Sequence, residues 1–266
     1  MPKLTKRNYF SLSNQYISNS KISDYIKSPH YFYRKHVIGD IEKPMTDALI
    51  LGSATDYWLM NGEEKFKKQY YLTSRRSKSA DDYEFQLNKT MYDQVEDMCR
   101  KVLSQTALKE LRGYTKQKVL QFDLPSAKQF PGIAGIPDYF KVNGDHATIV
   151  DLKTAANAEN PVKYHYHCLD YGYYRQVGLY KLLVSENFGV PIDNIDFYHI
   201  VIEKDPDKIY NCYTYHLSHD RAMHELREAL QIFEEMDNNK KFLPRDVSFK
   251  DALTIGDIEQ FEDDGE

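Results

Sequence analysis

The sequence has few cysteines, and they lie far apart. Only three occur among 266 residues, and no two of them form a CxxC pair. This spacing argues against a disulfide framework, a structural zinc ribbon and an iron–sulfur cluster. Long apolar runs are also missing, because no stretch approaches the ~18 apolar residues that a membrane span needs. The first ten residues lack the apolar region of a secretion signal. We therefore expect a soluble, cytoplasmic protein with no membrane partner.

Acidic charge is concentrated at the end of the chain. Residues 251–266 contain seven acids and no base, whereas the whole chain has a net charge of −5. This tail accounts for the negative sum, and we expect it to be flexible. The segment 63–78 has the opposite character, with six bases and two acids. These bases form either a phosphate-contacting edge or an ordinary solvated surface. The candidates for nucleic-acid contact in this segment are Lys65, Lys67, Lys68, Arg75 and Arg76.

The spacing of apolar and turn residues divides the chain into a helical part, residues 1–111, and a sheet core, residues 112–240. No linker separates the two parts, so residues 1–250 are predicted to form one domain. We expect an α/β (α+β) fold with a mixed central sheet flanked by helices. The expected helices cover 46–60, 82–111, 158–168, 171–188 and 219–239, the last one capped by Ser218. The expected strands cover 116–123, 132–142, 146–154, 195–204 and 208–216, and 63–81 is expected to be a loop or short strand.

A β-hairpin is predicted in the segment GIPDYFKVNGDHATIVDLKTA, residues 135–155. If Asn143–Gly144 form the centre of a type I′ turn, Asp138 and Asp151 are diagonal neighbours across the hairpin. Side chains alternate with a period of two along a strand. Asp138, Asp151 and Lys153 are therefore predicted to lie on one face of the sheet.

Two acids and a lysine that converge on one patch need a physical reason. Carboxylates that are ~7–8 Å apart repel each other unless a cation lies between them. Their hard oxygen atoms suit Mg²⁺ or Mn²⁺. Such an ion lowers the pKa of a bound water and offsets charge on a phosphoryl oxygen, while Lys153 can orient the water and stabilise the transition state. The alternative is a surface Asp–Lys pair beside a turn aspartate, which is common in hairpins.

These residues resemble the signature of the PD-(D/E)xK nuclease superfamily, with Pro137-Asp138 followed by Asp151-Leu152-Lys153. The segment YYRQVGLY contributes Gln176 and Tyr180, which resemble the QxxxY motif of the exonuclease branch. Residues four apart share one helix face, so both side chains can point back at the hairpin. The upstream segments KISDYIKSPHYFYRKH and LILGSATDYWLM are similar to the family's N-terminal segment and its GTAxHxxL helix. The nearest resemblance is to phage-type exonucleases of the exonuclease VIII (RecE) kind, and more distantly to lambda exonuclease.

The resemblance implies a restriction-endonuclease-like αβββαβ core and metal-dependent hydrolysis of phosphodiester bonds in DNA. Asp138 and Asp151 would then be metal ligands and Lys153 the catalytic lysine, while Gln176 and Tyr180 would orient the site or touch the DNA backbone. By the same analogy the protein would be an exonuclease on the ends of linear duplex DNA, part of phage or prophage recombination. It would work with a recombinase or annealing protein, as a ring-shaped oligomer.

The sequence departs from the family pattern at several positions. Asp56 stands where relatives have a histidine, and we interpret it as an oxygen ligand to the metal. Ile136 replaces a frequent basic residue, and Gln117 stands near the position of a glutamate. These departures keep two alternatives open, a structure-selective endonuclease on the same core and a catalytically silent relative that binds DNA or protein. Arg34 is a candidate for contact with a terminal phosphate.

Overall fold

A mixed five-stranded sheet lies at the centre of the computed structural model, which describes residues 4–11, 14–41, 45–79, 82–205, 207, 210–239 and 242. The strand order is β3-β6-β7-β8-β9, and within it only β7 and β8 run parallel. The strands are β3 (Thr115–Lys116), β6 (Tyr139–Asn143), β7 (His146–Ala155), β8 (Ile195–Glu203) and β9 (Cys212–His216). The predicted acidic tail, residues 251–266, lies outside the described residues.

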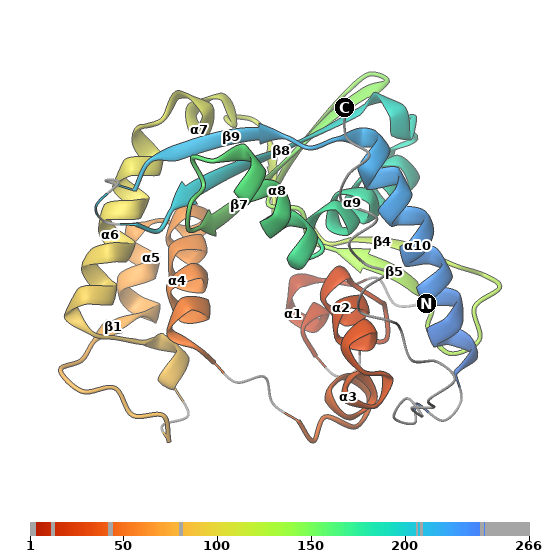
Figure 1. Ribbon diagram of the computed structural model, residues 1–266, viewed down its shortest axis with the longest axis horizontal. Helices are drawn as coiled ribbons and strands as arrows, with labels where there is room; N and C mark the ends of the chain where they lie inside the picture. The colour runs from red at the N-terminus through yellow and green to blue at the C-terminus, as the bar shows by residue number, and fades with distance from the viewer. Residues whose placement is uncertain are drawn as a thin grey trace, which may run out of the picture.

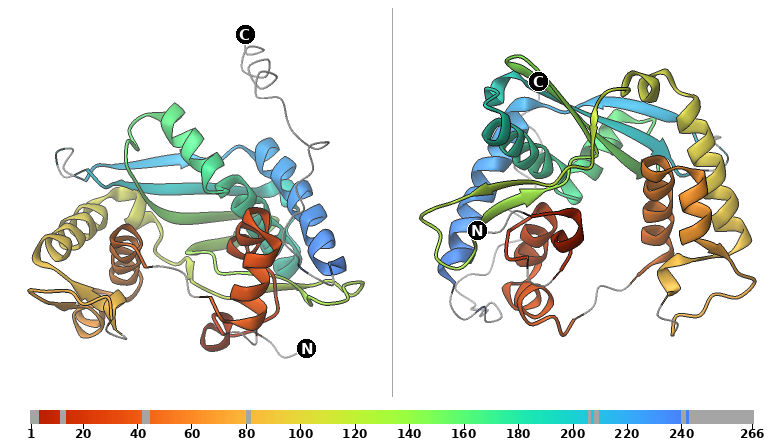
Figure 2. Two further views of the ribbon diagram at one scale, coloured as in Figure 1. Left: turned by 60° about the horizontal axis from the view of Figure 1, so that its bottom comes forward. Right: turned by 180° about the vertical axis from the view of Figure 1, so that it is seen from behind.

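Helices cover both faces of this sheet, which confirms the predicted fold class (Figure 1). They are α1 (Lys6–Tyr9), α2 (Asn19–Lys27), α3 (Pro29–Tyr33), α4 (Asp47–Asn61), α5 (Glu63–Gln69), α6 (Lys89–Ser104), α7 (Thr106–Glu110), α8 (Pro161–Asp170), α9 (Tyr173–Phe188) and α10 (His219–Asn238). Ile149 of β7 packs in the same core as Val177 of α9. Its neighbour Val150 belongs to a separate cluster with Leu111, just after α7. The two views of Figure 2 show α4–α7 at one end of the sheet and α1–α3 with α10 at the other. No helix within the described stretches has the length and apolarity to cross a bilayer.

The continuous strands that the sequence predicts over 116–123 and 132–142 are each divided between two sheets. Gln117 adopts a left-handed backbone with φ of 43°, which ends β3. Pro137 has no N–H group for a ladder hydrogen bond and interrupts the second stretch. The outer pieces pair with each other as β4 (Leu120–Asp123) and β5 (Gly132–Gly135), and a further small sheet joins β1 (Tyr71–Leu72) to β2 (Gln86–Leu87).

The loop or short strand expected over 63–81 is wrong in its first part, which forms α5. Gly62, with φ of 88°, ends α4 as the sequence predicts and separates it from α5. Phe66 is fully buried, and its ring centroid lies 4.7 Å from that of Trp58 on α4. Because one apolar residue in a run of charged ones produces no helical periodicity, the pattern alone does not predict this helix.

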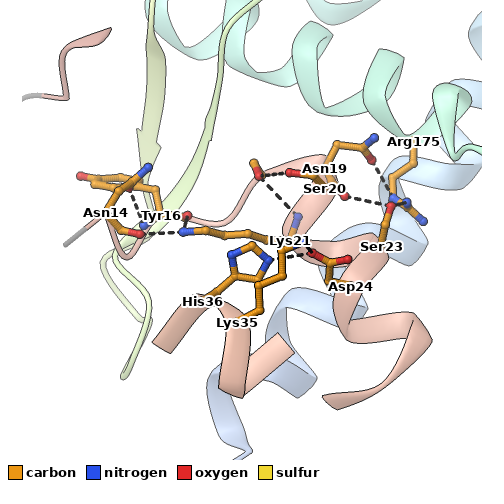
Figure 3. A network of polar contacts seen from close by, with 11 residues as sticks. Asn14, Tyr16, Asn19, Ser20, Lys21, Ser23, Asp24, Lys35, His36 and Arg175 are labelled. Atoms are coloured by element: carbon orange, nitrogen blue, oxygen red, sulfur yellow. Dashed lines mark hydrogen bonds and ion pairs between the residues drawn. The ribbon is translucent and has the colours of Figure 1, made fainter. Parts of the chain in front are cut away.

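A polar network ties the N-terminal helices to the start of α9 (Figure 3). The Arg175 guanidinium donates from Nε to Asn19 Oδ1 at 2.8 Å and from Nη2 to the Ser23 hydroxyl, both on α2. Gly172 precedes α9 with φ of +63°, and a Cβ there would lie 2.4 Å from Arg175 Nη2. On the far side of α2, Lys21 Nζ donates to the carbonyl oxygens of residues 14 and 16 at 2.6 and 2.8 Å. This network therefore fixes where α9 begins.

Two helix glycines in this fold predict opposite effects of alanine substitution. A Cβ on Gly178 of α9 would lie 2.6 Å from the backbone oxygen of Ala222 on α10, whereas a Cβ on Gly52 of α4 would meet only Thr154 Oγ1, at 3.6 Å. Gly178→Ala should lower the free energy of unfolding by about 1–3 kcal/mol because backbone cannot move aside cheaply. Gly52→Ala should raise it by up to about 1 kcal/mol through helix propensity. Urea denaturation at equilibrium measures both, and equal effects at the two sites would contradict the close α9–α10 contact.

Candidate active site

The hairpin of β6 and β7 has a different register from the predicted one. Asn143 pairs with His146, so the turn consists of Gly144 and Asp145, not Asn143–Gly144. Gly144 has φ of +63° and Asp145 has no positive φ, which is typical of a II′ turn rather than a I′ turn. The turn moves by one residue and each pairing partner therefore by two, so the alternation of faces is preserved. Continued by one position beyond Tyr139–Val150, the register puts Asp138 directly opposite Asp151.

The second half of β7 has a strand neighbour on one side only. Pairing with β6 stops at Val150, whereas pairing with β8 continues to Ala155. On the open side, the Leu152 backbone N–H donates to Asp138 Oδ2 at 2.8 Å in place of a ladder bond. This hydrogen bond fixes the Asp138 carboxyl group at the open edge of β7, next to Asp151.

Asp56 approaches the same edge from α4. Its Oδ2 accepts a hydrogen bond of 3.4 Å from Gln117 Nε2, and the Gln117 backbone N–H donates to the carbonyl of Asp138 at 3.0 Å. Burial, and then the charge of Asp151, raise the pKa of Asp56 to about 6. Burial and the charges of Asp151 and Asp56 raise the pKa of Asp138 well above its usual value. The three predicted acids therefore form one electrostatically coupled group.

Lys153 is the only predicted cation that the structure brings to these acids. Its ammonium forms an ion pair with Asp151 and lies 4.6 Å from the centroid of the Tyr173 ring. Burial alone would lower the pKa of Lys153, but the charges of Asp151 and of other nearby groups outweigh it and hold the pKa above its usual value. Lys153 is thus a fixed positive charge at neutral pH.

Gln176 and Tyr180 of α9 meet each other and the strand that leads to Asp138. Gln176 Nε2 donates to the Tyr180 hydroxyl at 3.2 Å, and that hydroxyl donates to the Ile136 carbonyl at 3.1 Å. A Cβ on Gly135 would lie 2.6 Å from the Tyr180 ring, so the glycine permits this close approach. Gln176 Oε1 is buried and has no hydrogen-bond partner among the described residues. The motif pair therefore holds the backbone just before Asp138.

A cavity of about 410 Å³ opens beside this group, between α4 and the ends of β7 and β8. Asp56 and Lys153 line it, together with residues of α8 and α9. Another cavity, of about 500 Å³ and lined by Tyr16, Asp123 and Phe130 among others, contains none of the predicted site residues. We therefore take the cavity beside Asp56 and Lys153 as the candidate site.

The predicted DNA-contacting bases do not line this cavity. Arg34 is paired with Asp40 at 3.1 Å. Lys67 and Arg76 also have acidic partners, Glu63 and Asp47, each at 2.6 Å. Lys65, Lys68 and Arg75 are exposed. Contact of all six with DNA stays a prediction.

The side chains present suit a divalent cation chemically. Asp56, Asp138 and Asp151 offer only oxygen ligands, which Mg²⁺ and Mn²⁺ prefer. Burial, and then repulsion between the acids, raises the pKa values of the first two, and a bound cation would offset both effects. The structure does not hold them in a finished ligand shell, since no cluster of three or more His, Cys, Asp or Glu able to hold a metal occurs in the described part of the chain. Asp151 is engaged by Lys153. The three carboxylates fit such an ion. To bind it, the Asp151 carboxylate would have to contact both the ion and Lys153.

Two neighbours of the site were not among the predicted site residues. Tyr173, whose ring faces Lys153, lies three residues before Gln176 on α9, and only the helical spacing from that motif could have drawn attention to it. Gln117 is noted in the sequence only as a departure from the family pattern. Its amide bond to Asp56 depends on the turn at φ of 43°, which no pattern predicts.

The central sheet, the helices on its two faces and the acids at the edge of β7 define the PD-(D/E)xK class of fold. The chain belongs to the family described as "PDDEXK-like domain of unknown function (DUF3799)", whose sequence pattern matches residues 18–245. A search of curated proteins finds no match. These findings support the interpretation as a nuclease at this general level.

A solved structure agrees with the fold. A crystal structure from Eubacterium rectale described as a "Putative exonuclease" aligns with a TM-score of 0.67 and 18% identity, over 97% of this chain and 98% of that chain. At this identity the likeness shows a shared fold. The structure of SSO0001 covers 80% of this chain and 82% of that chain, but its TM-score of 0.30 at 10% identity carries no argument.

The pKa of Asp56 predicts how stability depends on pH in the absence of divalent ions. The pKa of Asp56 in the folded chain is raised from 3.8 to about 6. Between these two pH values the folded chain therefore holds a proton that the unfolded chain has already lost. Stability should therefore fall as the pH rises through this range, by up to about 3 kcal/mol for this group. Asp56→Asn should match the wild type near pH 4 and exceed it in stability above about pH 7.

Urea unfolding in EDTA as a function of pH measures this difference. Mg²⁺ added at about pH 7.5 should then stabilise the wild type much more than Asp56→Asn, since binding to the folded state alone adds stability. Asp97→Asn, at an exposed acid of α6, serves as the control. Parallel pH profiles for the wild type and Asp56→Asn would contradict the raised pKa of Asp56.

Proposed function

We propose that this protein is a divalent-metal-dependent deoxyribonuclease whose cleavage site is the cavity beside β7. The observation that carries the proposal is the convergence of Asp56, Asp138 and Asp151 with Lys153 on the open edge of that strand. Two acids with raised pKa values, a third acid and a buried lysine are costly to keep together. Ionisable groups with shifted pKa values are expected to cluster at active sites, where catalysis requires them.

Asp56, Asp138 and Asp151 would hold the metal ion, which is Mg²⁺ or Mn²⁺ by the chemistry of its ligands. When bound, this ion supplies activation of a water and neutralisation of phosphoryl charge. Lys153 keeps its proton at neutral pH. Its ammonium can therefore hydrogen-bond a non-bridging oxygen of the phosphodiester or the attacking water, where it offsets the negative charge that develops.

Gln176 and Tyr180 act through the backbone in this proposal. The Tyr180 hydroxyl holds the Ile136 carbonyl, two residues before Asp138. This hydrogen bond limits where the Asp138 carboxyl group can move, since Asp138 is also fixed by Leu152. Both are positioning residues for a ligand carboxylate. The free Oε1 of Gln176 remains available to accept a hydrogen bond from a bound water.

Within this class we propose an exonuclease that acts on the ends of linear double-stranded DNA in phage or prophage recombination. The QxxxY pair and the resemblance to exonucleases of the exonuclease VIII (RecE) kind support this choice. A recombinase or annealing partner and a ring-shaped oligomer belong to the same proposal and rest on the resemblance alone.

The proposal is tested by incubating the protein with linear duplex DNA and with covalently closed circles, in Mg²⁺, in Mn²⁺ and in EDTA. Loss of the linear form alone, abolished by EDTA, is the expected result. Lys153→Met should lower the rate by at least about 100-fold, because it removes a preorganised charge without removing the side-chain volume. Lys163→Met, at an exposed lysine of α8, should leave the rate unchanged.

The other outcomes decide between the alternatives. Cutting of the closed circles would favour an endonuclease on the same core. DNA binding without loss of either substrate, in every metal, would contradict the proposal and favour a silent relative. An equal loss of rate in the two lysine variants would mean that Lys153 acts only through the general charge of the surface.

A further inference from the structure

A column of aromatic rings ends at the rim of the candidate site. Tyr171, just after α8, lies with its ring centroid 4.4 Å from that of His167, at an interplanar angle of 30°. His167 stacks on Tyr164 at 5.9 Å and 18°, and Tyr164 stacks on Tyr215 of β9 at 4.6 Å and 18°. The inner end of the column is fixed, because the Tyr164 hydroxyl hydrogen-bonds His199 Nδ1 at 2.8 Å.

The outer ring of this column is open to solvent. Tyr171 is 60% exposed, although it belongs to a stack whose third member, Tyr164, is only 3% exposed. Tyr171 lines the same cavity as Asp56 and Lys153. An exposed aromatic face that is held rigid from behind loses little conformational freedom when another flat ring packs on it.

A cation lies on the wall of the same cavity. Lys204 follows β8, and its backbone N–H donates to the Ala155 carbonyl at 2.9 Å, which fixes it at the end of β7. Its side chain is half-buried and has no ion-pair partner within the described residues. Burial lowers the pKa of His167, and the positive charge of Lys204 lowers it further. Lys204 therefore lies near the aromatic column.

We propose that Tyr171 and Lys204 form a nucleotide-binding subsite of the cleavage cavity, in which Tyr171 stacks on one unpaired base and Lys204 contacts an adjoining phosphate of the same DNA strand. The inference rests on the proposed nuclease function, and it describes how that nuclease would hold one strand of its DNA substrate. Tyr171 and Lys204 line the same cavity as Asp56 and Lys153, so one bound strand can contact both pairs. Stacking on tyrosine tolerates every base, as a nuclease without sequence preference requires.

The chemistry of the two residues is complementary to that of a nucleotide. Tyr171 offers an apolar face, and Lys204 offers a charge that is shielded from water by the cavity wall. A duplex presents its bases edge-on and stacked, so only an unpaired base can lie flat on Tyr171. The subsite therefore requires that the strand end entering the cavity is single-stranded over at least one nucleotide.

The test is binding of short single-stranded DNA oligonucleotides in Ca²⁺, with 2-aminopurine placed at successive positions from each end. One position should show strong fluorescence quenching with the wild type, through stacking on Tyr171. Tyr171→Leu should abolish that quenching and weaken binding about 5- to 150-fold, whereas Tyr171→Phe should bind like the wild type. Tyr166→Leu is a matched control, since Tyr166 is 58% exposed on α8 and does not line the cavity.

Two further arms do not depend on the leucine variant. An abasic site at the quenched position should weaken binding to the wild type and leave binding to Tyr171→Leu unchanged. Lys204→Gln should reduce the slope of log K against log salt by about 0.7, the value for one phosphate contact on a single strand. Lys163→Gln should keep the wild-type slope.

The outcomes separate the subsite from the nuclease proposal. If DNA is not cut in Mg²⁺ but the quenching and the salt slope change as described, the subsite stands and the nuclease proposal fails. If DNA is cut while Tyr171→Leu, Lys204→Gln and the abasic oligonucleotide all behave like the wild type, the subsite is overturned. Absence of any DNA binding by the wild type overturns both.

Discussion

The candidate site depends on one gap in the hydrogen-bond ladder of the central sheet. Since β6 begins only after Pro137 and Asp138, the outer half of β7 has no strand on that side. Its Leu152 N–H would be unsatisfied there, and the Asp138 carboxylate accepts it. This hydrogen bond thus brings one acid to the strand that carries Asp151 and Lys153. Asp56 of α4 reaches the same edge through its hydrogen bond with Gln117.

The acids oppose folding, and the surrounding structure holds them together. The raised pKa values of Asp56 and Asp138 mean that their ionised forms are disfavoured where they lie. Apolar contacts elsewhere compensate for this. Trp58 and Ala54 of α4 are buried in one cluster, and Ile149 of β7 is buried in another. A site that is unfavourable when empty is one that a bound cation stabilises.

Much of this arrangement could be predicted from the sequence, because the shared face of the two hairpin acids and the lysine tolerates an error of two residues in the strand pairing. The predicted turn is wrong by one residue, which shifts each pairing partner by two. A shift of two keeps Asp138, Asp151 and Lys153 on one face, whereas a shift of one would have put Asp138 on the other face. The helix α5 could not be predicted, since its packing depends on Phe66 alone. Nor could the contact of Tyr173 with Lys153, since Tyr173 belongs to no motif and lies on a different element.

The departures from the family pattern have structural consequences of their own in this chain. Ile136 lacks a basic side chain, but it is the backbone carbonyl that is used, as the acceptor for Tyr180. Gln117 lacks a carboxylate, and its neutral amide instead donates to Asp56. A glutamate at that position would add a fourth negative charge to a group of three that already repel one another. The two departures therefore compensate for each other. An acid in place of a histidine, at Asp56, adds negative charge to the site, and a neutral amide in place of a glutamate, at Gln117, removes it.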